Sequence, residues 1–127
     1  MAHTVTTLSP SDLDVYRKAL KNRRVAVESL ANSRFKKACE VADRAAALLR
    51  EEFSVKKVMV FGSLVHPHLF HSRSDVDLAV WGLDERQYFR AVGILQSLEP
   101  EIEVDLIAFE KATGSMQEVI LREGKEL

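Results

Sequence analysis

The chain has 127 residues, enough to bury one hydrophobic core but too few for two ordinary domains. Hydrophobic residues make up 46% and charged residues 29%, and no apolar run approaches the ~18–20 residues of a membrane span. The formal net charge is −1, and a near-neutral chain argues against nucleic acid as a partner. We therefore expect a cytoplasmic protein that does not enter a membrane.

The first half of the chain has helical patterning. Between Pro10 and Gly62 there is neither a proline nor a glycine, and Ser9 followed by Pro10 is a typical helix start. Apolar residues recur at steps of three, four or seven from Leu13 to Phe53, which is helical periodicity. This pattern predicts a helical segment over residues 10–52, as one long helix or as two helices of roughly 10–31 and 33–52. Its first part is a candidate arm that packs on a partner subunit.

The remainder of the chain alternates strand and helix signals. Strand patterning occurs in Lys56–Phe61, Val76–Trp81 and Glu101–Ala108. Amphipathic helical patterning occurs in Asp84–Leu98 and in Ser115–Glu123, and residues 64–73 form a loop with a helical turn. The order α-α-β-β-α-β-α predicts an α/β fold in which helices flank a small mixed β-sheet, and the whole chain, 1–127, forms a single domain.

Two expected strands carry carboxylates. Asp75 and Asp77 are two residues apart, so in a strand they point to the same face, about 6–7 Å from each other. Both interrupt an apolar run, where an unpartnered charge is costly. Asp105 lies within the third strand. Three carboxylates on neighbouring strands suit a divalent cation, although strand-end carboxylates that face water remain an alternative.

The first expected strand ends in Gly62-Ser63, twelve residues before Asp75. Glycine lets the backbone approach phosphate oxygens closely, and serine offers a hydroxyl and an N–H group to them. Nucleotidyl transfer displaces pyrophosphate from a nucleoside triphosphate, and two magnesium ions can stabilise both ends of that displacement. The combination of the Gly-Ser turn with the three aspartates therefore predicts metal-assisted nucleotidyl transfer.

The sequence resembles the minimal nucleotidyltransferases of the DNA polymerase β superfamily. The similarity lies in Phe61-Gly62-Ser63, in Ser74–Val80, in Val104–Ile107 and in Ile120–Gly124, and covers roughly residues 40–127. It implies the nucleotidyltransferase fold, with Gly62 and Ser63 holding the triphosphate of ATP. It also implies that Asp75, Asp77 and Asp105 are the catalytic residues and bind Mg²⁺.

The resemblance further implies a biological setting. Such small proteins pair with a HEPN-domain toxin as the antitoxin of a toxin–antitoxin module. They are thought to silence this ribonuclease by transferring AMP from ATP to one of its tyrosines. We therefore expect a hetero-oligomer with a HEPN protein, and homodimerisation stays open. The alternative is a non-catalytic antitoxin that neutralises its partner by occlusion.

The loop after Gly62-Ser63 departs from the family pattern. Eleven residues separate Ser63 from Asp75, whereas ten are usual, and the basic turn often found there is missing. Arg73 is a candidate substitute for the missing basic residue. The same loop holds His66, His68 and His71, for which a zinc site, contact with nucleotide or acceptor, and no role are all open.

Overall fold

The computed structural model describes residues 10–71 and 75–127. Its longest element is α2, a single helix of 44 residues over Pro10–Phe53. Of the two arrangements that the sequence allows, the uninterrupted helix is therefore the one formed, and Asn32-Ser33 lies inside it. The physical reason is that neither residue removes a backbone hydrogen bond, as proline would. Ser9, the expected cap, lies outside the described residues.

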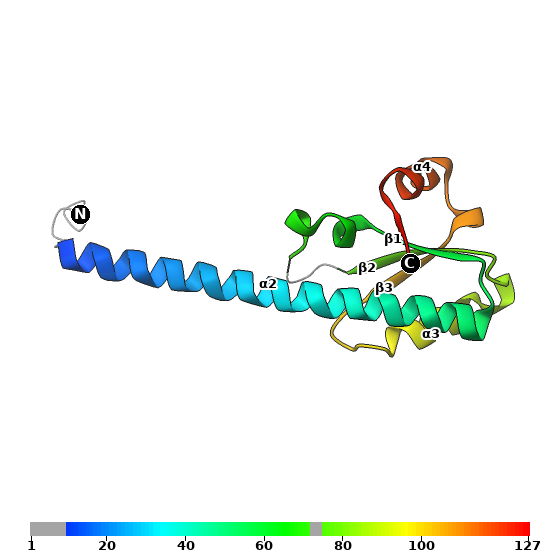
Figure 1. Cartoon of the computed structure of the whole chain (residues 1–127), viewed down its shortest axis with the longest axis horizontal. Coiled ribbons are helices and arrows are strands. Elements are labelled where there is room, and N and C mark those ends of the chain that lie inside the picture. Colours follow the sequence, from blue (N-terminus) through cyan, green and yellow to red (C-terminus); the bar gives the residue numbers. More distant parts are fainter. Residues whose placement is uncertain (1–9, 72–74) are drawn as a thin grey trace.

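The two ends of α2 have different surroundings. Towards its C-terminal end the helix buries a stripe of mostly small residues, which allows close approach to the sheet: Ala38, Val41, Ala42, Ala45, Ala46, Leu49 and Phe53. Towards its N-terminal end the helix extends beyond the sheet (Figure 1), and the side chains of Leu13, Val15 and Leu20 are exposed. Even this long helix, the longest of the described part, has no stretch apolar enough to cross a membrane.

Four strands form one mixed sheet in the order β3-β2-β1-β4. Their bounds are Lys57–Phe61 for β1, Val76–Trp81 for β2, Val104–Ala108 for β3 and Lys125–Glu126 for β4. β2 pairs antiparallel with β1 and parallel with β3, while β4 pairs antiparallel with β1. The mixed sheet confirms the expected fold class. The two-residue β4 was not predicted, because it is too short and polar to carry strand periodicity.

Several predicted boundaries were wrong by one to four residues. β3 begins at Val104 rather than Glu101, because the preceding residues turn, with the N–H of Ile102 donating to the carbonyl of Glu99 over 3.1 Å. The helix predicted from Asp84 is α3, Tyr88–Gln96, and the residues before it form a 3₁₀ turn. The Asp84 side chain caps that turn by accepting from the N–H of Arg86. The last helix, α4, was predicted and spans Gly114–Glu123, so it begins one residue earlier than expected.

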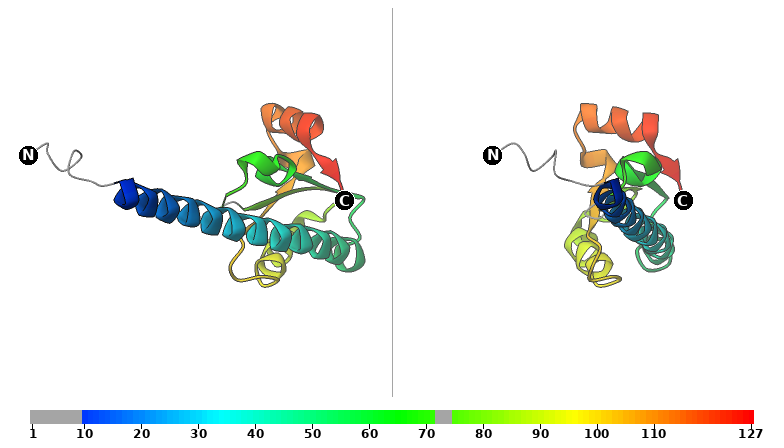
Figure 2. Two further views of the ribbon diagram at one scale, coloured as in Figure 1. Left: turned by 60° about the vertical axis from the view of Figure 1, so that its left-hand side comes forward. Right: turned by 90° about the vertical axis from the view of Figure 1, so that its left-hand side faces the viewer.

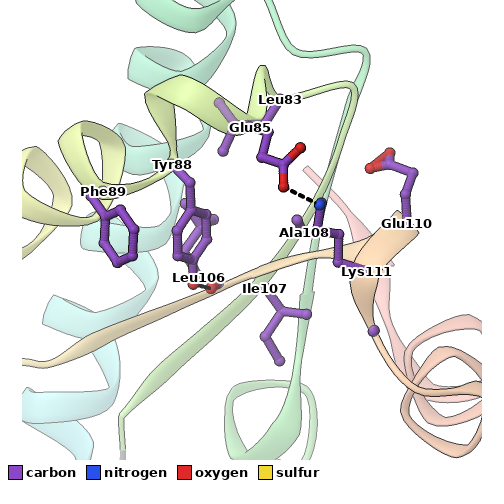
Figure 3. Close-up of a pocket in the computed structure, with 10 residues that line it drawn as sticks. Leu83, Glu85, Tyr88, Phe89, Leu106, Ile107, Ala108, Glu110 and Lys111 are labelled. Atoms are coloured by element: carbon purple, nitrogen blue, oxygen red, sulfur yellow. Dashed lines mark hydrogen bonds and ion pairs between the residues drawn. The ribbon is translucent and has the colours of Figure 1, made fainter.

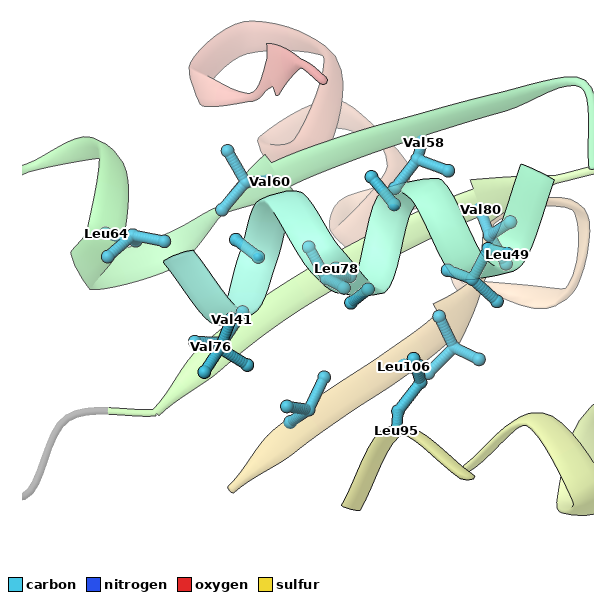
Figure 4. Packing of buried hydrophobic residues seen from close by; sticks show 14 of the residues in the cluster. Val41, Leu49, Val58, Val60, Leu64, Val76, Leu78, Val80, Leu95 and Leu106 are labelled. Carbon is cyan, nitrogen blue, oxygen red and sulfur yellow. The ribbon is translucent and has the colours of Figure 1, made fainter. Parts of the chain in front are cut away.

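The sheet lies between two helical layers (Figures 1 and 2). On one face α2 and α3 cover the main core, to which alternate strand residues contribute (Figure 4): Val58, Val60, Val76, Leu78, Val80, Val104 and Leu106. On the other face α4 covers a smaller cluster of Phe61, Ala79 and Ile120. The main core thus fixes which strand residues point to the α4 face, and the aspartates are among them.

Candidate active site

Asp77 and Asp105 are brought together by the register of the sheet. They are direct partners in the parallel pairing of β2 with β3. Val76 and Leu78 on either side of Asp77 are buried in the main core. Because strand side chains alternate, Asp77 must point to the opposite face, and the same holds for Asp105 between Val104 and Leu106. The two carboxylates therefore lie side by side on the α4 face.

The carboxylates interact strongly. The pKa of Asp77 is raised from 3.8 to about 6, mainly by burial and then by the nearby charges of Asp105 and Asp75 and by a hydrogen bond to the Asp105 carboxyl. Asp77 and Asp75 are half-buried and Asp105 is exposed. The site therefore holds negative charge that repels itself, and a bound cation would relieve that repulsion.

The donor set fits a hard divalent cation. Carboxylate oxygens are the ligands that Mg²⁺ prefers, and Mg²⁺ is commonly held by one or two carboxylates together with water and phosphate oxygens. Within the described residues, no three His, Cys, Asp or Glu side chains already form a closed ligand cluster. The arrangement is a close pair, Asp77 and Asp105, with Asp75 within electrostatic reach. Such an open set suits an ion that shares its ligands with a substrate.

Gly62 directly adjoins the aspartate pair. It follows Phe61, which is the register partner of Asp77 across β1 and β2. Its φ is +74°, and a Cβ atom at this position would lie 2.3 Å from Oδ2 of Asp77. Glycine is thus required both by the left-handed backbone and by the closeness of the carboxylate. A 3₁₀ turn of four residues, Gly62–Val65, begins here and places Ser63 next to the site, so no long helix contributes its dipole.

A cavity opens in front of the aspartates. Its volume is about 520 Å³, within the usual range for a small-molecule site. Asp77, Asp105 and Phe61 line one part of it, and Tyr88 of α3 and Met116 of α4 line another. The sequence analysis did not identify this role of Tyr88. The ring of Tyr88 is half-buried, and its hydroxyl donates to the carbonyl of Leu106 over 2.6 Å. Both contacts arise from tertiary packing and have no signal in the sequence.

Two further aromatic residues, Trp81 and Phe89, have different surroundings. Trp81 is half-buried and stacks on Phe109, with the ring centroids 4.4 Å apart. Phe89 is 85% exposed and is therefore not a core residue. Its place on the first turn of α3 turns it away from the sheet, which hydrophobicity alone could not show.

The histidine loop gives no support for zinc. His66 and His68 lie with their rings 5.9 Å apart in an edge-to-face contact. Nε2 of His66 lies 3.6 Å from a carboxylate oxygen of Glu123, so one histidine already has a partner. In the part of the chain that the structure describes, including this loop, no three His, Cys, Asp or Glu side chains are placed to hold a metal ion. Arg73, the candidate basic residue, and Ser74 lie outside the described residues.

The comparison with known families agrees with this geometry. A family model described as polymerase beta nucleotidyltransferase matches residues 44–127. The chain belongs to this family. A search of functionally characterised proteins found no match to the chain. The family match begins within α2, so it includes every element of the sheet and all five candidate site residues, but not the projecting part of the helix.

Several solved structures are similar to this nucleotidyltransferase. One is a toxin–antitoxin complex with AMP-PNP, at 25% identity and a TM-score of 0.58, over 67% of this chain and 70% of that chain. A second is the MntA–HepT toxin–antitoxin complex, at 22% identity and a TM-score of 0.52, over 68% of each chain. A third is the MNT antitoxin in complex with the tri-AMPylated HEPN toxin of Shewanella oneidensis, at 22% identity, a TM-score of 0.54 and 70% coverage of each chain. The last two similarities, both at 22% identity, show that the fold is shared.

Proposed function

We propose that this nucleotidyltransferase transfers AMP from ATP to a tyrosine of a HEPN-domain toxin and so acts as its antitoxin. The observation that carries the proposal is the pairing of Asp77 with Asp105 beside Gly62-Ser63. The 25% identical neighbour was solved with AMP-PNP, which supports ATP as the donor. The neighbours described as complexes with HEPN toxins, one of them AMPylated, support the choice of partner and acceptor.

Each site residue has a role in this proposal. Gly62 and Ser63 hold the triphosphate, since the turn leaves room for phosphate oxygens and offers an N–H and a hydroxyl group. Asp75, Asp77 and Asp105 hold Mg²⁺, which when bound neutralises charge on the phosphates. Asp105, the most exposed of the three, faces the acceptor and takes up the proton of its hydroxyl.

The reaction forms one bond and breaks one. The tyrosine oxygen bonds to the α-phosphorus of ATP, and the bond from that phosphorus to the bridging oxygen breaks, so that pyrophosphate leaves. The site residues act by positioning and by electrostatics, as is usual for phosphoryl transfer.

The test is intact-mass spectrometry of the protein copurified with the HEPN protein encoded next to it, after incubation with MgCl₂ and ATP. We expect the HEPN protein to gain one or more AMP units. The Asp75→Asn/Asp77→Asn variant should abolish the gain. Glu52→Gln is the control, because it removes an exposed carboxylate on α2, which covers the opposite face of the sheet. EDTA in place of MgCl₂ tests the metal.

The occlusion alternative predicts a different result. A binding module would form a stable complex with the HEPN protein without any change in mass. Its double-asparagine variant would still neutralise the toxin in cells, whereas an enzyme variant would bind but no longer neutralise. Growth of cells that express the toxin with each variant therefore separates the two functions.

A further inference from the structure

β3 is the outermost strand of the sheet, and one side of its backbone faces away from the other strands. The N–H of Val76 on β2 donates to the carbonyl of Glu103 over 3.0 Å, so the backbone groups of Glu103 point inward. In a parallel pair these directions alternate along the strand. The N–H and C=O groups of Val104, Leu106 and Ala108 therefore point to the free edge.

Part of this edge is covered by side chains of α3. The amide of Gln96 donates to the carbonyl of Val104 and accepts from its N–H, as a neighbouring strand would. The hydroxyl of Tyr88 donates a hydrogen bond to the carbonyl of Leu106. The carbonyl of Ala108 begins the 3₁₀ turn Phe109–Lys111 and is therefore engaged. Beyond these contacts the edge still presents the N–H groups of Leu106 and Ala108, for which the described part of the chain offers no further strand.

A groove runs along this uncovered part of the edge (Figure 3). Its volume is about 610 Å³, and Leu106, Ile107 and Ala108 form its floor. One wall is Tyr88 and the exposed ring of Phe89. An ion pair between Glu85 and Lys111 lies beside Ala108, towards the end of β3.

The groove continues into the active-site cavity. Tyr88, Leu106 and Ile107 line both, and Asp105 lies just before them on β3. Across the sheet the order is therefore Gly62-Ser63 after β1, Asp77 on β2, Asp105 on β3 and finally the groove. In phosphoryl transfer the attacking and leaving oxygens lie roughly in line on opposite sides of the phosphorus. If the leaving pyrophosphate lies at Gly62-Ser63, the acceptor hydroxyl enters from the β3 side.

We propose that the acceptor protein binds in this groove through an extended segment that pairs with the free edge of β3 at Leu106 and Ala108. An aromatic or aliphatic side chain of that segment packs against Phe89, and the modified tyrosine reaches past Tyr88 to Asp105. Edge pairing supplies affinity through the main chain, and the apolar wall supplies selectivity for the side chain. This inference rests on the proposed function and adds to it where and how the acceptor binds.

Ala108→Pro tests the edge directly. The φ of Ala108 is −75° with ψ of 114°, a conformation that proline adopts without strain, and its N–H points to the free edge rather than into the ladder. The variant therefore removes one docking hydrogen bond and keeps the sheet. Ala108→Val is the matched control, because it adds similar bulk but retains the N–H.

The experiment measures single-turnover AMP transfer against the concentration of the purified HEPN protein, together with the Kd for AMP-PNP. We expect Ala108→Pro to raise the half-saturating concentration of the HEPN protein about 3–10-fold, the value of one hydrogen bond. Ala108→Val should stay near the wild type. Phe89→Ser should raise the half-saturating concentration about fivefold or more. The ring of Phe89 is 85% exposed and meets Tyr88 edge to face, so its removal uncovers little of the core. The Kd for AMP-PNP should not change.

Three outcomes would overturn the inference. Unchanged half-saturation in both Ala108→Pro and Phe89→Ser would exclude the groove as the acceptor site. A weaker Kd for AMP-PNP with unchanged half-saturation would assign the groove to the nucleotide base instead. Equal effects of Ala108→Val and Ala108→Pro would show that bulk, not edge pairing, matters. Absence of transfer by the wild type would instead reject the proposed function, so the two failures are distinguishable.

Discussion

Replacing Asp77 by asparagine is expected to stabilise the metal-free protein at neutral pH. The pKa of Asp77 is raised to about 6, mainly by burial and then by the charges of Asp105 and Asp75. A rise from 3.8 to about 6 corresponds to about 3 kcal/mol at 1.36 kcal/mol for each tenfold change in acidity. Because Asp77 is only half-buried, solvent screening reduces the expected gain to about 1–2 kcal/mol.

The pH dependence gives this prediction its sign. The folded state binds the Asp77 proton more tightly than the unfolded chain does. Stability therefore falls with rising pH only between the two pKa values, where the unfolded chain has lost the proton and the folded state still holds it. Below about pH 4 the group is protonated in both states and the cost is absent. The cost develops as the pH rises from about 4 to 6 and is complete above that range. The asparagine of the variant cannot ionise, so the advantage of the variant should follow the same course.

The assay is thermal unfolding in EDTA at pH 4 and at pH 7.5. At pH 7.5 we expect Asp77→Asn to raise the Tm by about 3–8 °C, while at pH 4 the variant and the wild type should coincide within about 1 °C. Glu52→Gln serves as the control, since it removes an exposed carboxylate on α2, on the opposite face of the sheet from the site. A variant that is less stable than the wild type at pH 7.5, or equally stabilised at both pH values, would refute the reasoning.

Three further predictions concern the turn, the core and the projecting helix. Gly62→Ala should destabilise the fold by about 1–3 kcal/mol in urea unfolding and abolish AMP transfer, because its Cβ would meet Asp77 and its φ is +74°. Gly93→Ala is the control, since Gly93 is exposed and has open space for a Cβ. Leu49→Ala should cost about 2–5 kcal/mol, measured in the same way, because the side chain is fully buried beneath the sheet. Removing residues 1–32 should leave the free energy of unfolding within about 1 kcal/mol of the full chain, because among the side chains that the structure describes the buried stripe of α2 begins at Ala38. A loss of several kcal/mol would show that the projecting part stabilises the domain.

The sequence predicted those features that depend on local periodicity. The long helix, three of the four strands and α4 follow from apolar spacing, and the aspartates stand out because they interrupt apolar runs. Alternation alone placed Asp77 and Asp105 on strands. That the two aspartates are register partners could not be predicted. The register of β2 with β3 depends on how α3, which connects the two strands, packs against the sheet.

Other features of the site have no local signal. Gly62 is required by the carboxylate of Asp77, fifteen residues further along the chain, and that closeness arises only once β1 and β2 pair. The groove along β3 is formed by backbone groups and by the ring of Phe89. The ring is exposed, whereas the hydrophobicity of phenylalanine would suggest a buried position. Tyr88 and Gln96 act through hydrogen bonds to the backbone of β3, which no sequence pattern distinguishes from ordinary helix positions.

The cost of Asp77 also bears on the choice between enzyme and occluding partner. A module that only covers its toxin gains nothing from a half-buried carboxylate beside two others, since asparagine would fill the same space without the repulsion. A nucleotidyltransferase needs that charge, because binding of a divalent cation turns the repulsion into affinity. The two functions therefore differ in one measurable way: MgCl₂ with AMP-PNP should raise the Tm of the wild type more than that of Asp77→Asn. Equal shifts in the two proteins would remove this argument for catalysis and favour occlusion.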